Sequence, residues 1–222
     1  MKKMIVTIII LFIIFISMVI FKNIEKSQEI KVDEINKIEK YVEKIYGWKE
    51  ITDEALPEFN DINNVNEKWI WGIVRENIED IETDYETIEK TAKELYGDSF
   101  QKKFPTEGNE FISYDNDKQK YTVKQTNLDA INDSYLLNKI ERIKDGYTVE
   151  IVEYLVDFTN EDNGNVQIKN LQNEKIYELT AEDATESNIK KVVKENISRF
   201  NKKKIFLKNN NDSVIITKVE KE

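Results

Sequence analysis

The side chains that most often carry out chemistry in proteins are missing from this sequence. The chain contains neither cysteine nor histidine, which excludes thiolate nucleophiles, zinc–thiolate sites, histidine acid/base catalysis and Ser-His-Asp arrangements. Acid/base work is left to Asp, Glu, Lys and Tyr, and neighbouring carboxylates such as Glu182 and Asp183 usually point apart. We therefore expect no catalytic residue, no cofactor and no metal, and we interpret the protein as a non-enzyme.

One oxygen-rich segment invites comparison with a calcium loop. Residues 157–165 read DFTNEDNGN, and hard cations such as Ca²⁺ prefer oxygen ligands. If Gly164 took the glycine position of an EF-hand loop, Thr159 would stand at position 1 and Asn170 at position 12, where acidic residues are expected. A solvated hairpin turn is therefore favoured over a calcium site.

The three tryptophans are candidates for contact with a partner or a ligand. Trp69 and Trp71 are two positions apart, which on a helix separates them by about 200° around the axis, so both cannot face one core. One of them, together with Trp48, is a candidate contact residue, because aromatic side chains are enriched at interface hot spots and in pockets. The alternative is that loop 48–62 or a neighbouring helix covers the second indole.

One local basic cluster stands against an acidic background. It consists of Lys190-Lys191 and Lys202-Lys203-Lys204, which flank a helix expected near 185–200. We interpret it as a solvated edge whose charges complement the helix ends. A patch for an anionic polymer or lipid is the secondary interpretation.

An uncharged apolar segment begins the chain. Residues 4–21 read MIVTIIILFIIFISMVIF, and as a helix they would span about 27 Å, close to the thickness of a hydrocarbon core. No pair of small residues follows at the spacing of a cleavage site, so an uncleaved anchor is favoured over a cleaved secretory signal. Lys2 and Lys3 precede the segment, which favours a cytoplasmic N-terminus.

The sequence therefore divides into four parts. They are a cytoplasmic stub at 1–3, a transmembrane anchor at 4–21, a tether at 22–31 and one extracytoplasmic domain at 32–222. The lack of disulfides and a composition typical of AT-rich bacterial genomes suit a bacterial cell membrane protein with a single pass. The chain carries 33 Lys plus Arg against 43 Asp plus Glu, a net charge of −10, which argues against a nucleic-acid partner.

Hydrophobic periodicity predicts three helices at the start of the outer domain. Apolar residues three or four positions apart run through 32–46. A second helix is expected over 64–79, with Asn63 or Asn64 as its cap. A third begins with the capping box Thr83-x-x-Glu86 and ends before a glycine.

The period then changes to that of strands. One hairpin is expected over 111–123, and another surrounds Asp145-Gly146, a strong hairpin signal. In strand 147–158 the apolar positions change face midway, so we expect a bulge or coverage on both faces. The fold class is α+β: an N-terminal transmembrane helix, three helices, and a curved antiparallel sheet with one late helix. The remaining elements are strands at 165–170, 175–179, 203–208 and 213–220 and the helix near 185–200.

This order of elements resembles bitopic, membrane-anchored bacterial proteins with a nuclear-transport-factor-two-like (cystatin-like) outer domain. The resemblance covers residues 32–222 and rests on element order and on the kinked strand 147–158, without a diagnostic motif. The late helix departs from the simplest form of that fold, which leaves a cystatin-like or unrelated α+β arrangement open. Such folds host enzymes, ligand binders and scaffolds, so the resemblance implies no activity.

Two functions of different classes follow. The first is a non-catalytic, membrane-tethered interaction or scaffold module, held by residues 4–21, that binds another envelope protein. The second is a small-molecule-binding or hydrolytic domain with a pocket between helix 64–79 and the sheet, using Tyr, Asp or Glu. Two convergent carboxylates of raised pKa in an enclosed pocket favour the second function, and an exposed apolar patch on a packed domain favours the first.

Overall fold

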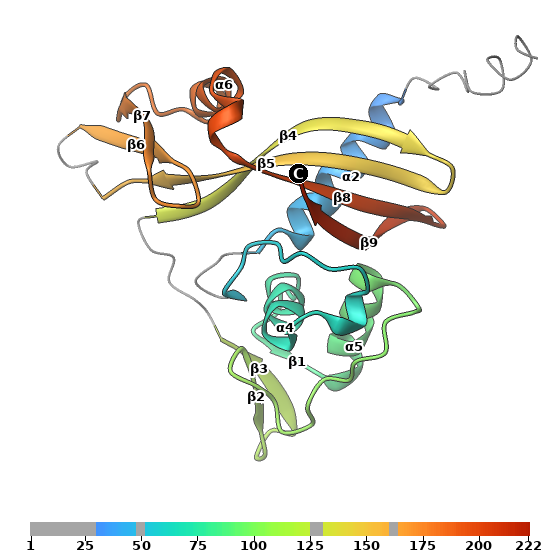
Figure 1. Ribbon diagram of the computed structural model, residues 1–222. Coiled ribbons are helices and arrows are strands. Elements are labelled where there is room, and N and C mark those ends of the chain that lie inside the picture. The colour runs from blue at the N-terminus through green and yellow to red at the C-terminus, as the bar shows by residue number, and fades with distance from the viewer. Residues whose placement is uncertain (1–29, 48–51, 125–130, 160–163) are drawn as a thin grey trace, which may run out of the picture. The chain divides into compact units, whose positions relative to one another are not determined.

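The computed structural model describes residues 30–47, 52–124, 131–159 and 164–222 (Figure 1). The chain divides between Lys31 and Val32, and all the described helices and strands belong to Val32–Glu222. This part has the predicted α+β class, with α-helices and antiparallel sheets. No described helix is long and apolar enough to cross a membrane, and the apolar run at 4–21 lies outside the described residues.

Three α-helices lie in the first part of the described residues, as the periodicity predicts. Helix α2 buries a stripe of residues three or four positions apart, and the hydroxyl of Tyr41 in this stripe joins it to two other elements. That hydroxyl donates to the Leu95 carbonyl at 2.6 Å and accepts the Ile216 backbone N–H at 2.7 Å. The helices are α2 (Val32–Ile45), α4 (Glu67–Glu76) and α5 (Tyr85–Tyr96), with the short 3-10 helix η1 (Ile62–Asn64) before α4.

The first turns of α4 and α5 differ from the predicted caps. The cap of α4 is Asn66, whose side chain accepts the backbone N–H of Lys68, because the expected cap positions form η1 instead. The N-cap of α5 is Asp84, which accepts the Thr87 backbone N–H at 2.7 Å. The capping box that begins at Thr83 is therefore wrong by one position, since Thr83 is held in a strand and Asp is at least as good a cap as Thr.

A small antiparallel sheet accompanies α4 and α5. Its strands are β1 (Glu82–Thr83), β2 (Ile112–Asp115) and β3 (Lys120–Val123), in the order β1-β3-β2. The hairpin of β2 and β3 is the one expected over 111–123. The expectation of one sheet is wrong, because β1 precedes α5 in the chain and pairs with β3 across a long sequence separation that no local pattern reveals.

The large sheet is organised around β5, which changes partner along its length. On one edge β5 pairs with β4 throughout. On the other edge it pairs with β8 over Gly146–Glu153 and with β6 over Leu155–Asp157. Almost every residue of β5 is buried, so the prediction of coverage on both faces is confirmed, and a register shift lies between Leu137 and Lys139 of β4. The strands are β4 (Ile131–Ile143), β5 (Gly146–Asp157), β6 (Asn165–Lys169), β7 (Lys175–Thr180), β8 (Asn201–Asn210) and β9 (Ser213–Lys221).

Each half of the large sheet has a helix packed on it (Figure 1). The late helix α6 (Glu186–Glu195) presents Ile189, Val192 and Val193 to a cluster that includes side chains of β5, β6 and β7. Helix α2 contacts β9 in the other half. The apolar spacing of α6, read from the sequence, thus identifies a face that is buried.

Candidate functional site

Trp69 is part of the core. Its side chain is 1% exposed, and its ring centroid lies 6.2 Å from that of Phe59 and 6.0 Å from that of Tyr96. Its indole N–H donates to the Ala55 carbonyl at 3.1 Å. The segment before α4 therefore covers this tryptophan, as the alternative interpretation of the sequence proposes.

Trp71, on the same helix, contacts other aromatic rings, which join those around Trp69 through the contact between Tyr96 and Phe100. It is 2% exposed, and its ring contacts those of Phe100 and Phe104 edge-on, at centroid distances of 5.9 and 5.2 Å. The two indoles thus face apart, and both are covered by the chain itself. Trp48 lies outside the described residues. A partner that docks on the described surface would meet neither Trp69 nor Trp71 directly.

The large sheet brings together charged side chains that are far apart in the sequence. Tyr135 of β4 and Asn201 of β8 both lie opposite Glu153 of β5. Because side chains alternate between the two faces of a strand, Asp133 and Lys203 lie on the same face as these three residues. Strand register alone therefore assembles an acid, base and tyrosine cluster, which we call the Glu153 cluster.

Glu153 is the centre of this cluster and is only 1% exposed. The ammonium nitrogen of Lys203 lies 3.1 Å from its Oε2, and the hydroxyl of Tyr46, just after α2, donates to its Oε1 at 3.4 Å. Lys203 also donates to the Leu56 carbonyl. The Tyr46 ring packs at a tilt against that of Tyr135, with 4.7 Å between the ring centroids. The cluster thus joins α2, the segment before α4 and three strands.

Burial dominates the electrostatics of the cluster. It raises the pKa of Glu153 above its usual value, and the ion pair with Lys203 opposes this rise only in part. Burial, together with the carboxylates of Glu153 and Asp133, also raises the pKa of Tyr46 well above its usual value. Tyr46 is therefore a neutral hydrogen-bond donor at physiological pH, and Glu153 titrates closer to neutrality than an exposed glutamate.

A cavity of about 230 Å³ opens beside the Glu153 cluster. It lies between the 54–58 segment and the sheet, and the predicted helix 64–79 contributes none of the residues that line it. Lys203, expected on a solvated edge, is 13% exposed and paired, so that interpretation is wrong for this residue because Glu153 draws it inward. The lining residues are Glu54, Ala55, Glu58, Asp133, Glu153, Leu171, Asn201, Lys202, Lys203 and Lys221.

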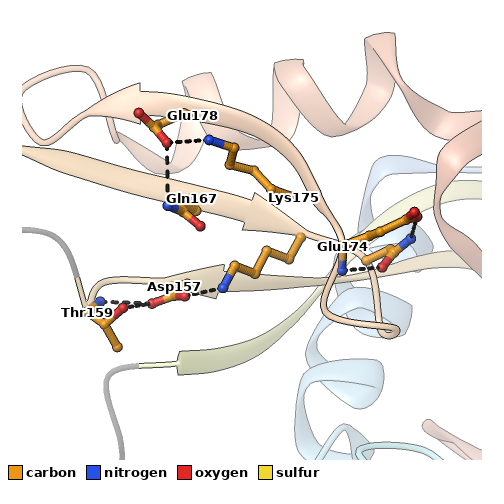
Figure 2. A network of polar contacts seen from close by, with 8 residues as sticks. Asp157, Thr159, Gln167, Glu174, Lys175 and Glu178 are labelled. Atoms are coloured by element: carbon orange, nitrogen blue, oxygen red, sulfur yellow. Dashed lines mark hydrogen bonds and ion pairs between the residues drawn. The ribbon is translucent and has the colours of Figure 1, made fainter.

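Asp157 is a second buried carboxylate and begins the segment considered for calcium. Thr159 donates to its Oδ1 through the backbone N–H at 2.9 Å and through the hydroxyl at 2.6 Å, and Lys169 forms an ion pair with Oδ2 (Figure 2). Burial raises the pKa of Asp157, but these bonds together outweigh that effect and hold the pKa below its usual value. Both oxygens are thus engaged within the chain, and the described residues contain no group of three acidic side chains suited to a metal ion.

The outer edge of β4 is the longest edge of the large sheet that pairs with no other described strand. Among the described strands β4 pairs only with β5, along a length of 13 residues. The outer edge of β9 is instead bridged by Phe59, whose backbone exchanges hydrogen bonds of 3.1 and 2.9 Å with Val219. An unpaired strand edge offers N–H and C=O groups to another chain. Asp133 and Tyr135 place the Glu153 cluster beside this edge.

Known proteins add no family to this picture. No family model matches the chain, and comparisons with curated proteins and with solved structures find no significant match. What the protein does is therefore inferred from its own residues.

Proposed function

We propose that the protein is a membrane-tethered interaction module whose outer domain, residues 32–222, binds a partner polypeptide along the outer edge of β4. In this proposal residues 4–21 form an uncleaved transmembrane helix in a bacterial cell membrane, with residues 1–3 in the cytoplasm and 22–31 as the tether. The partner is another envelope protein, and the module is not an enzyme. In this proposal the outer domain resembles nuclear-transport-factor-two-like domains, on the grounds of its element order and the long strand 147–158.

The outer edge of β4 is the observation that carries this proposal. A strand of 13 residues extends about 44 Å and can pair with an extended peptide over that length. Each backbone hydrogen bond formed in this way contributes about 0.5–1.5 kcal/mol net. Strand addition of this kind draws affinity from the backbone and specificity from alternate side chains.

The side chains of β4 are suited to a contact surface. From Ile131 to Leu137 they are all partly exposed, although Leu136 packs against the apolar cluster under α6 and Tyr135 packs against Tyr46. A partner strand laid along this stretch would place every second side chain beside Asp133 and Tyr135. The net charge of −10 favours a partner segment with basic residues at those positions.

The test is site-specific photo-crosslinking in native membranes. A photo-reactive residue replaces Lys139 of β4, and the matched control replaces Lys175 of β7. Both lysines lie on outer strands, are more than half exposed and pair with a nearby glutamate, at 2.7 and 2.9 Å. We expect one envelope protein to be captured reproducibly from position 139 and not from position 175.

The captured protein is then purified and added to the full-length chain in detergent micelles. Strand addition predicts slower amide hydrogen exchange across 131–143, with no change across 175–180. Equal capture at both positions, or no capture at position 139, would refute the proposal. So would a partner that slows amide hydrogen exchange elsewhere in the domain but not across 131–143.

A second candidate function is favoured by the raised pKa of Glu153 beside a cavity. In this alternative the cavity holds a small polar molecule, and Glu153 with Asp133 supplies acid/base groups for binding or hydrolysis. Thermal-shift screening of the full-length protein with small polar compounds tests it. A compound that stabilises the wild type but neither Glu153→Gln nor Asp133→Asn would support this function, and a screen without such a compound would rule it out for the classes tested.

A further inference from the structure

A groove of about 870 Å³ lies where the start of α5 meets the small sheet. It contains no residue of β4 and is therefore a different surface from the one proposed for strand addition. Its main lining residues are three tyrosines and three acids. We call it the tyrosine groove, and these residues are Tyr85, Tyr114, Tyr121, Asp84, Glu86 and Glu107.

Two of the three tyrosine rings are held in place by hydrogen bonds to backbone carbonyls, and the third, Tyr114, packs against Tyr121. The ring centroid of Tyr121 lies 4.9 Å from that of Tyr114 and 6.2 Å from that of Tyr85. The Tyr85 hydroxyl donates to the Phe104 carbonyl at 3.1 Å, and the Tyr121 hydroxyl donates to the Thr106 carbonyl at 2.8 Å. Tyr85 and Tyr114 are partly exposed and present ring surface to a ligand, whereas Tyr121 is buried and supports both rings.

The charges that line the groove are all negative. The described residues that line it include Asp84, Glu86 and Glu107 but no Lys or Arg. Acids at the start of α5 also complement its dipole, which accounts for Asp84 and Glu86, but Glu107 lies outside the helix. The bond from the Thr87 backbone N–H holds the pKa of Asp84 below its usual value, so this carboxylate is ionised at neutral pH.

The chain covers aromatic rings with its own cations elsewhere, but not here. Arg142 lies over the Tyr147 ring at 5.4 Å, and Lys218 lies over the Phe206 ring at 5.1 Å. Among the described residues no such contact involves the rings of the tyrosine groove. Tyrosine faces attract ammonium and guanidinium groups, and nearby carboxylates strengthen that attraction.

We propose that the tyrosine groove binds a basic segment of a partner polypeptide, with an Arg or Lys side chain over the tyrosine rings and its charge facing Asp84, Glu86 and Glu107. The groove is open to solvent, as a site for a segment of polypeptide lying across the surface must be. The net charge of −10 steers a basic segment toward the molecule. This surface binds its ligand whether or not a strand adds to β4, so the two proposals succeed or fail separately.

The experiment uses the full-length protein in non-ionic detergent micelles and two dye-labelled peptides. The probe is acetyl-Gly-Arg-Gly-Arg-Gly-amide, and its neutral counterpart carries Gln in place of Arg. Fluorescence anisotropy measures binding of each peptide to the wild type and to Tyr114→Ala, Tyr114→Phe and Glu107→Gln. The control variant is Tyr177→Ala, which removes an exposed tyrosine from β7.

We expect the Arg peptide to bind and the Gln peptide not to bind. Tyr114→Ala should weaken binding by about 5- to 30-fold, the equivalent of one cation–π contact, whereas Tyr114→Phe should retain it. Glu107→Gln should weaken binding and reduce its dependence on salt. Circular dichroism checks that each variant is folded.

Several results would overturn the proposal. Absence of binding by the Arg peptide would do so, as would equal affinity for the wild type and Tyr114→Ala, which would mean general attraction to an acidic surface. Tyrosine faces with carboxylate and amide neighbours also suit sugars. Binding of chitotetraose in place of the Arg peptide would therefore assign the groove to a carbohydrate and reject a basic segment.

Discussion

Replacing Lys203 with methionine removes the ammonium beside Glu153 while keeping most of the side chain's volume. Glu153 is 1% exposed, and Lys203 supplies its ion pair and a bond to the Leu56 carbonyl. Removing one partner of a buried pair costs about 3–5 kcal/mol, because the remaining charge is left uncompensated. A domain of this size is stable by only about 5–15 kcal/mol, so the loss is a large fraction of the total.

The neighbouring lysine provides the matched control. Lys202 pairs with Glu150 at 3.2 Å, but its side chain is 31% exposed, so solvent screens the interaction. Lys202→Met should therefore cost no more than about 1 kcal/mol. The assay is urea unfolding of the full-length protein in detergent, followed by tryptophan fluorescence, because Trp69 and Trp71 are buried reporters of the folded state.

The loss in the free energy of unfolding caused by Lys203→Met should depend on pH. Burial already raises the pKa of Glu153, and the variant loses the ion pair that lowers it. A carboxyl whose pKa is raised on folding binds its proton more tightly in the folded state. The electrostatic part of the gap between the two proteins is therefore complete above the folded pKa of the variant, and it closes below the folded pKa of the wild type, where Glu153 is protonated in both. The gap between wild type and variant should thus narrow as the pH falls from neutrality toward that value.

Two outcomes would refute this reasoning about Glu153. One is an equal loss in Lys203→Met and Lys202→Met, which would mean that burial of the carboxylate does not matter. The other is a deficit that stays constant with pH, which would mean that Lys203 acts through packing and its bond to the 54–58 segment. The double variant with Glu153→Gln should recover part of the loss, because no charge is then left without a partner.

Three further substitutions test the helix cap, a buried hydroxyl and a tight turn, each by chemical denaturation. Asp84→Ala removes the N-cap of α5 and should cost about 0.5–2 kcal/mol, and an unchanged free energy of unfolding would contradict the observed cap. Tyr41→Phe removes the hydroxyl that bonds the Leu95 carbonyl and the Ile216 N–H, and it should cost about 1–3 kcal/mol. An unchanged free energy of unfolding would contradict these two hydrogen bonds. At Gly146 a Cβ would lie 1.9 Å from the Leu207 carbonyl oxygen, so Gly146→Ala should strongly destabilise the sheet. Wild-type stability in this variant would contradict the close contact between the two backbones.

Local elements of the fold could be predicted because their signals are local. The end of α5 at Gly97, with φ 82°, and the hairpin at Asp145-Gly146 depend on residues within a few positions. The cap at Asp84 was missed because Thr83 also fits a capping pattern, and only the pairing of β1 with β3 decides between them. Such pairing depends on contacts across the chain that the sequence pattern does not contain.

The Glu153 cluster could not be predicted for the same physical reason. Asp133, Glu153 and Lys203 belong to three strands, and only the register of those strands places them on one face. Shifting the register of any one strand by one residue would send its side chain to the opposite face. The composition did limit the site to Asp, Glu, Lys and Tyr, and the cluster contains these types together with Asn201. The anchor at 4–21 lies outside the described residues and stays a prediction.

The partner change along β5 has a consequence for the order of folding. Glu153 of β5 pairs with Asn201 of β8, so the chain returns to β5 beside its pairing with β6 only after it has formed β6, β7 and α6. Closing an unstructured loop over 154–200 carries an entropic cost that grows with length, about 3.4 kcal/mol. If β6, β7 and α6 first collapse onto their own apolar cluster, the ends of that loop are brought together and the cost is met before β8 docks. Mutations within that cluster, such as Val193→Ala, should therefore slow folding of the whole domain and not only loosen one half of its sheet.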